Sequence, residues 1–525
     1  MKKIITSITI LSFGCAFGQN IKYSFGQEFK TVKKHQDFGF YKLDKNKYAE
    51  AYYKKGKDMV FQIYDAKFNN IKEEETILLP KESKKYANEG FFEVKKDFFW
   101  FYSTWNRKEK TERLFALPFN KNSVKFDAND IKLIESDKLA SYFGYGKYSF
   151  NTSNDSTMML VTYRVKPKER RDKLNKDVIG FNLFDSKMKK LYAAEIEMPY
   201  SEADMDNLDY EIDSRGNIYM LTQVKLDNSL DGEKSKETKN TYRYELIRVN
   251  QKDNTLQSIK ILLDNKFTNS VVLTEDLNHN LVISGYYSNK KNGGSSDGAY
   301  IIKLELDEKN SVKNLNTTYC EFPADVLTAY ENKRQKKKMD KKDKDKDLEA
   351  ANLDFEKVVF NPDGSMLIIG QEYYVVTHVH SNGKTTTYSY TYYYNDIYVL
   401  KADKNGKTQW CSKIPKSQVG SGSADLSYHF HKYKGEYYFF YLDNIKNINL
   451  ALTEKPVPHS SGRGGYLTCV KIDDNGKMTK KSIFDIKDEK VKLYPRSFES
   501  INENLIVDRL KEDRKHSKVF SLEIN

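Results

Sequence analysis

The chain has 525 residues and a formal net charge of +13, and 14% of its residues are aromatic, with 38 Tyr and 30 Phe against 10 Pro. This composition indicates a core of aromatic β-strand residues, and the absence of a long amphipathic period argues against a helical repeat. The charge lies largely in local Lys/Arg runs typical of solvated loops, and no aromatic-basic RNA-binding phrase is present. We therefore expect no nucleic-acid partner.

The N-terminus has the features of a signal peptide over residues 1–18. Two lysines precede the apolar run Ile4–Phe13, and Ala16–Gly18 is an acceptable cleavage site before Gln19. We expect export to the periplasm or the extracellular space. An alternative is a lipoprotein attached through Cys15, although the residues before it fit a lipobox poorly. No other segment approaches the ~20 apolar residues of a membrane helix.

A repeated strand phrase runs from about residue 37 to the C-terminus. Its clearest copy predicts four strands, over residues 208–212, 218–226, 242–249 and 256–263. The strands are separated by polar turns, and successive copies follow at about 60 residues. This spacing and the alternation of apolar and polar residues are typical of four-stranded propeller blades. The sequence therefore predicts an all-β fold, a β-propeller.

The two ends of the repeat predict how the ring closes. The eighth copy provides strands over 505–510 and 518–524 and then stops one strand short, whereas an isolated strand over 21–29 precedes the first copy. Because an open ring exposes unpaired strand edges, we predict eight four-stranded blades closed by the N-terminal strand. Seven blades with one irregular hairpin are the alternative. Residues 19–525 are expected to form one domain.

Two further features concern loops and cysteines. The run 331–347 is almost free of apolar residues, which predicts a flexible charged insertion that proteases cut first. Cys320, Cys411 and Cys469 each lie in a predicted strand, where a buried cysteine acts as a small apolar residue.

Catalytic and metal-binding motifs are weak. Gly294–Gly298 matches G-x-S-x-G, but it lies in a polar loop rather than at a strand-to-helix turn, so Ser296 is not expected to be catalytic. Two pairs, His378/His380 and His429/His431, could each offer two imidazoles on one strand face, with Asp425 as a further ligand only by proximity in sequence. We expect no catalytic residue, no metal site and no cofactor.

One blade resembles a known group of repeats. The phrase Asp396–Lys401, followed by Asn405–Gly406 and Trp410, resembles the blade phrase of exported bacterial β-propeller repeats of the PQQ-like and SBBP types, whose functions are unknown. The resemblance covers one blade well and the others loosely. It implies a propeller in the cell envelope and brings no catalytic residues with it.

The long connections between second and third strands are where we expect binding, since variable loops on a rigid scaffold carry function. Residues 371–394 predict a long hairpin with a tight Asn-Gly turn at its tip. The candidate binding residues are the ladder on one face of this hairpin and two histidines, namely Tyr388, Tyr390, Tyr392, Tyr394, His378 and His380.

These features predict a function in binding. We expect an exported, monomeric binding or scaffolding module for a protein or anionic polysaccharide partner. The alternative is a carbohydrate-active or other hydrolytic propeller enzyme. A pair of carboxylates at the centre of the long-loop face would favour the enzyme, and an aromatic or basic rim would favour the binding module.

Overall fold

The computed structural model describes residues 21–525 except for several segments. The segments left out are 32–34, 55–58, 77–85, 140–146, 168–174, 226–241, 262, 265, 269, 291–293, 307–311, 331–348, 382–384, 423–425, 463 and 512–514. The expected signal peptide with Cys15, the charged insertion 331–347 and Asp425 therefore lie outside the described residues. Within the described part, no helix is both long and apolar enough to cross a membrane.

The chain folds into antiparallel sheets that follow one another in sequence. Sheet 1 contains β3 (His35–Asp44), β4 (Lys47–Lys54), β5 (Met59–Tyr64) and β6 (Asn70–Thr76). Sheet 2 contains β7 (Tyr86–Val94), β8 (Asp97–Asn106), β9 (Thr111–Asn120), β10 (Lys125–Phe126) and β11 (Ile131–Ser136). Sheet 3 contains β12 (Tyr148–Thr152), β13 (Met158–Arg164), β14 (Lys176–Asp185) and β15 (Lys190–Ser201).

The next two sheets repeat this order. Sheet 4 contains β16 (Met205–Ile212), β17 (Ile218–Lys225), β18 (Tyr242–Asn250) and β19 (Thr255–Ile261). Sheet 5 contains β20 (Phe267–Thr268), β21 (Val272–Glu275), β22 (Leu281–Ser288), β24 (Gly298–Leu306) and β25 (Val312–Glu321). Beside it lie the two-stranded sheet of β23 (Ser295–Ser296) and β26 (Ala350–Ala351), and the short helix α1 (Ala324–Leu327).

The last three sheets carry the longest hairpin and both ends of the described chain. Sheet 6 contains β27 (Leu353–Phe360), β28 (Met366–Ser381), β29 (Thr386–Ala402), β30 (Thr408–Ile414), β31 (Gln418–Gly420) and β34 (His459–Ser460). Sheet 7 contains β32 (His429–Tyr433), β33 (Glu436–Asp443), β35 (Tyr466–Ile472) and β36 (Met478–Asp485), with the 3-10 helices η2 (Ile445–Asn447) and η3 (Pro495–Ser497) in its connections. Sheet 8 contains β37 (Glu499–Asn502), β38 (Leu505–Lys511), β39 (His516–Ile524), β1 (Ile21–Phe25) and β2 (Phe29–Lys30).

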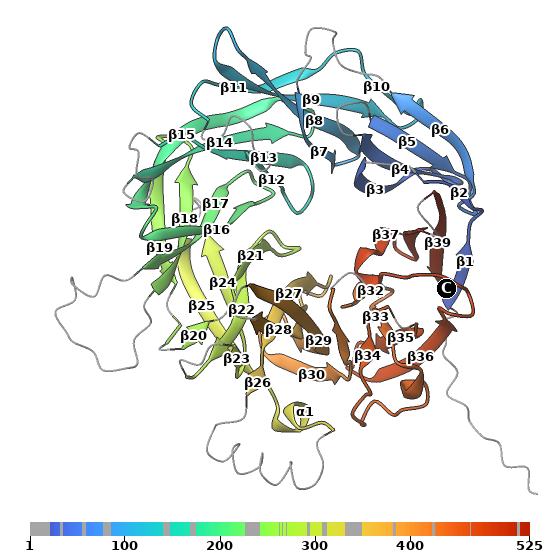
Figure 1. The fold of residues 1–525 in the computed structure, drawn as a ribbon. Helices are drawn as coiled ribbons and strands as arrows, with labels where there is room; N and C mark the ends of the chain where they lie inside the picture. The colour runs from blue at the N-terminus through green and yellow to red at the C-terminus, as the bar shows by residue number, and fades with distance from the viewer. Residues whose placement is uncertain are drawn as a thin grey trace, which may run out of the picture.

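Pairing of the N-terminal strand closes the arrangement. β1 pairs with β39 from Ile21↔Ile524 to Phe25↔Phe520, and β2 pairs with the other end of β39. The strand expected over 21–29 thus completes the last sheet, as predicted. Figure 1 shows the sheets following one another around a common axis, so that the first sheet lies beside the last. The all-β prediction is confirmed.

The core is divided among the spaces between sheets. Eight clusters of buried, mostly aliphatic and aromatic side chains each join two successive sheets of the described chain. The cluster between sheets 8 and 1 contains Tyr64 and Phe68 from one side and Val507 and Val519 from the other. Because each sheet packs against a neighbour on both sides, its middle strands, such as β5 and β22, are buried on both faces and read as nearly continuous apolar runs, whereas an outer strand such as β15 alternates.

A charged group is buried at the same closure. Arg509 of β38 forms ion pairs with Asp37 at 2.6 Å and Glu50 at 3.2 Å, and its guanidinium lies over the ring of Tyr52. The hydroxyls of Tyr52 and Tyr64 both donate to Glu50. Burial raises the pKa of Glu50 to about 8, although the nearby Arg509 opposes this shift.

One turn recurs between strands and explains the repeated polar phrase. At six turns of the described chain an Asp side chain accepts hydrogen bonds from the backbone N–H groups two and four residues later, as in Asp213–Asn217. The same bonds occur at Asp65, Asp185, Asp276, Asp403 and Asp473. The fourth residue of each turn has a positive φ, which Gly adopts most readily, and it is Gly at 216, 406 and 476. The phrase is therefore a folding device.

The three cysteines of the described chain are free thiols, with Cys320 and Cys469 buried and Cys411 half-buried. Ser296 is fully buried in β23.

Candidate functional site

Long connections gather at one end of the ring, which we call the long-loop face. Because neighbouring strands are antiparallel, the connection between the second and third strands of a sheet leaves on the same side as the link to the next sheet. This side carries the β28–β29 hairpin, the β33–β35 connection and the β36–β37 link. They contact one another, since β31 pairs with both β29 and β34, and Arg496 donates a hydrogen bond to Tyr394 Oη at 3.2 Å.

The β28–β29 hairpin presents two different faces. Opposite residues of an antiparallel pair share a face, and the register pairs Val375 with Tyr392, Thr377 with Tyr390, and Val379 with Tyr388. These six side chains, together with Tyr373 and Tyr394, form what we call the tyrosine face. Tyr388 and Tyr390 are 60% and 46% exposed, whereas Tyr394 is buried. The predicted ladder therefore has an exposed outer half and a packed inner half.

The predicted histidines lie on the opposite face of the same hairpin. His378 pairs with Ser389 and His380 with Thr387, and His378 Nε2 lies 2.9 Å from Thr391 Oγ1. The structure thus separates them from the tyrosines. Among the described residues, no group of three or more His, Cys, Asp or Glu side chains is placed to hold a metal ion.

A buried lysine fixes the base of the hairpin. Lys416 is 1% exposed, and its ammonium donates to Tyr394 O at 2.7 Å and to Gln418 Oε1 at 2.9 Å. Its backbone N–H donates to Asp396 Oδ1 at 3.0 Å. Burial lowers the pKa of Lys416 to about 7 and raises the pKa of Asp396 to about 6. Because these groups are enclosed, they position β29 and do not meet a ligand.

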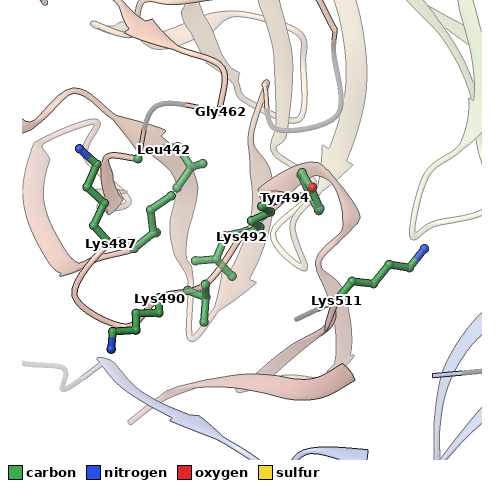
Figure 2. Close-up of a pocket in the computed structure, with 11 residues that line it drawn as sticks. Leu442, Gly462, Lys487, Lys490, Lys492, Tyr494 and Lys511 are labelled. Atoms are coloured by element: carbon green, nitrogen blue, oxygen red, sulfur yellow. The ribbon is translucent and has the colours of Figure 1, made fainter. Parts of the chain in front are cut away.

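A pocket of about 620 Å³ opens on the long-loop face between sheets 7 and 8 (Figure 2). Four lysines with exposed side chains line it, namely Lys487, Lys490, Lys492 and Lys511. Its apolar lining consists of Leu442, Ile486, Val491 and Leu493, all of which are buried. Figure 2 shows Lys487 and Lys490 extending outwards on one side and Lys511 on the other. The pocket therefore combines an apolar floor with a cationic rim.

Local backbone geometry shapes this rim. Gly464 has a φ of +82°, and a Cβ at this position would collide with the side chain of Lys487. Glycine thus allows the lysine stem to lie across the β33–β35 connection. The nearby Glu489 accepts a hydrogen bond from Tyr23 Oη at 3.0 Å. Among the described residues that line the pocket, the charged ones are the four lysines.

Sequence reasoning did not find these lysines. Three of them lie within six residues, in the phrase Lys487-Asp-Glu-Lys490-Val-Lys492, but this run reads as an ordinary solvated loop. Lys511 belongs to another sheet, at the end of β38. The alternation of Lys490, Val491, Lys492 and Leu493 was the available signal, because it places charge and apolar groups on opposite sides of one segment.

Comparisons with known proteins show only distant similarity. No family model and no curated protein matches the chain. Among solved structures, it is similar to the Dos1 propeller, with 9% identity, a TM-score of 0.38 and coverage of 95% of each chain. It is similar to the polysaccharide lyase Uly1, with 9% identity, a TM-score of 0.34 and coverage of 95% of this chain and 99% of the other.

A third solved structure is the β-propeller domain of the Trilobed protease from Pyrococcus furiosus. It has 9% identity and a TM-score of 0.31, over 78% of this chain and 90% of that one.

Proposed function

We propose that the chain is an exported, envelope-associated β-propeller of eight blades that binds an anionic polysaccharide in the lysine-lined pocket. The blade count is supported by the eight sheets of at least four strands and by the eight clusters between them. Export is supported by the signal-peptide features of residues 1–18.

The observation that carries the ligand class is the pairing of a cationic rim with an apolar floor. A polysaccharide with carboxylate or sulfate groups matches both, because its anionic groups meet ammonium groups while the C–H faces of its sugar rings meet aliphatic side chains. Its repeating charges also suit lysines spread along a rim. The described residues that line the pocket include no carboxylate pair, which supports a binding module over a hydrolytic enzyme.

The test is calorimetric titration of the mature chain with oligogalacturonate as the polyanion and a neutral dextran oligomer as the control ligand. Four exposed ion pairs at ~0.2–1 kcal/mol each would weaken binding between roughly fourfold and several-hundredfold when the four lysines are changed to Gln. Binding is also expected to weaken as salt rises.

A matched control changes four lysines in the short turns of the opposite end, Lys45, Lys96, Lys252 and Lys407, which are all exposed. This variant has the same net charge as the pocket variant and is expected to bind like the unchanged chain. Equal binding of dextran and oligogalacturonate, or an equal loss in both variants, would show that the pocket is not the site.

A second candidate is a protein partner on the tyrosine face. The specific observation is a contiguous exposed row in which Val375, Val379, Tyr388 and Tyr390 are 39%, 59%, 60% and 46% exposed. Tyrosine provides large contact area with little rotamer entropy to lose, as interfaces require. Recovery of one envelope protein that crosslinks to a photoreactive group at residue 388, and not to one at residue 252, would support this function.

A further inference from the structure

Three polar side chains meet on the inner wall of the ring. Ser500 lies on β37, and His429 and His431 lie on β32, the first strands of neighbouring sheets (Figure 1). Ser500 Oγ is 2.8 Å from His431 Nδ1 and 3.1 Å from His429 Nε2. Ser500 is exposed, so its hydroxyl is open to solvent on this wall.

A backbone carbonyl determines the tautomer of one ring. His431 Nε2 lies 2.7 Å from Glu503 O, and a carbonyl oxygen can only accept, so this nitrogen carries the proton. Burial lowers the pKa of His431, which keeps the ring neutral. Nδ1 therefore has a free lone pair, and the Ser500 hydroxyl donates its proton to it.

The second ring has the complementary role. Burial lowers the pKa of His429 to about 3, with smaller contributions from His431 and Lys357, so it is also neutral. Since the only proton of Ser500 is directed to His431, His429 Nε2–H must donate to Ser500 Oγ. One imidazole thus accepts the hydroxyl proton while the other donates to the hydroxyl oxygen.

A cation lies on the other face of β32, because successive side chains of a strand point to opposite faces and Phe430 stands between His429 and His431. Lys357 is on β27, the first strand of sheet 6, and its ammonium is 5.4 Å from the centre of the Phe430 ring, between the two histidines in sequence. Its charge is among the causes of the low pKa of His429. Lys357 therefore acts on the histidines only at longer range, by helping to keep His429 neutral.

We propose that Ser500 is a nucleophile towards small acyl esters, with His431 as its general base. Ser500 Oγ forms a bond to the ester carbonyl carbon while its proton moves to His431 Nδ1. The bond from that carbon to the alcohol oxygen then breaks, and the alcohol leaves with the proton from His431. Water repeats the sequence on the acyl-serine, releases the acid and restores Ser500. His429 Nε2–H stabilises Ser500 Oγ as it loses its proton.

The experiment uses the mature chain with a fluorophosphonate probe, followed by peptide mass spectrometry, and with 4-nitrophenyl acetate as substrate. We expect one adduct, on Ser500, and no adduct in Ser500→Ala. His431→Gln is expected to slow both reactions by roughly 10²–10⁴-fold, the usual contribution of a general base.

The matched control is Ser497→Ala. Ser497 is also exposed, and its hydroxyl oxygen lies 2.7 Å from Tyr494 O and 3.0 Å from Asp508 Oδ1, two acceptors for its one proton, with no histidine among these partners. This variant is expected to react like the unchanged chain. Absence of an adduct on Ser500 in the unchanged chain, a result that does not depend on any variant folding, would overturn the proposal. Equal labelling of His431→Gln, with its thermal unfolding unchanged, would also overturn it. Neither outcome bears on the binding of oligogalacturonate in the lysine-lined pocket. The proposal for Ser500 can therefore fail while the proposed binding function stands, and the reverse is also true.

Discussion

Replacing Arg509 by Met tests how the ring is held closed. The side chain is 8% exposed, and it joins sheet 8 to sheet 1 through Glu50 and Asp37. Methionine keeps much of the volume but removes the contacts of the guanidinium with Asp37, with Glu50 and with the Tyr52 ring. The carboxyl group of Glu50 is 1% exposed, so it cannot replace its lost partner with bulk water.

The size of the effect depends on the protonation of Glu50. Its folded-state pKa is about 8, above the ordinary value of 4.5, so below pH 8 the folded protein holds the carboxyl neutral. Below pH 8 the substitution therefore removes a hydrogen bond, the half-exposed ion pair with Asp37 and the packing of the arginine side chain. Together these losses should lower the free energy of unfolding by about 1–3 kcal/mol. Above pH 8 the unchanged chain ionises Glu50 beside Arg509, whereas the variant, with a still higher pKa, retains the proton.

The sign of the pH dependence follows from proton binding. Between pH 8 and the higher pKa of the variant, its folded state binds one proton more than its unfolded state, so its stability falls by about 1.4 kcal/mol per pH unit. At pH 9.5 the deficit reaches about 3–5 kcal/mol, the usual cost of removing one partner of a buried ion pair. An unfolding entropy of about 2.1 cal/mol/K per residue amounts to roughly 1 kcal/mol/K for this chain. A loss of about 1 kcal/mol therefore lowers Tm by about 1 °C.

The assay is thermal unfolding followed by near-ultraviolet circular dichroism at pH 6.5 and pH 9.5. We expect Arg509→Met to lower Tm by about 1–3 °C at pH 6.5 and about 3–5 °C at pH 9.5. The control is Arg113→Met, because Arg113 also pairs with two glutamates but its side chain is 28% exposed. It should lower Tm by at most about 1 °C at both pH values. An equal loss for Arg509→Met at both pH values would refute the role assigned to Glu50.

Three other predictions concern closure, the hairpin and the repeated turn. Deleting residues 21–30 removes β1 and β2 and exposes the edge of β39, so Tm should fall by more than for any single substitution above; an unchanged Tm would exclude closure by this strand. Changing Tyr388 and Tyr390 together to Ser should leave Tm within about 1 °C, since both side chains are exposed, and a larger fall would show that the ladder packs. Gly406→Ala forces alanine to a φ of +85° and places its Cβ 3.0 Å from Thr318 Oγ1, so we expect a loss of about 1–3 kcal/mol in urea unfolding. Full stability would contradict that reason.

The sequence determined the features that depend on neighbouring residues. The turn at Asp213–Asn217 closes through hydrogen bonds among five consecutive residues, so its polar phrase is sufficient to predict it. The register of the long hairpin follows in the same way from its two arms, which placed Tyr388 and Tyr390 on one face. The role of the strand over 21–29 was predictable because the last copy lacks one strand. Without a partner, the edge of that copy would be left unpaired, which is unfavourable.

Only the tertiary structure decided the sites. Lys511 meets the lysines of the β36–β37 link because sheets 7 and 8 pack side by side, which no local pattern encodes. The sequence indicated His429 and His431 as a pair, but their shared contact, Ser500, is 69 residues beyond His431. The alternation of residues along a strand predicts the face of the sheet to which each side chain points. The angle and spacing between neighbouring sheets determine which side chains come into contact between them. That spacing is set by the packing of all the clusters around the ring together.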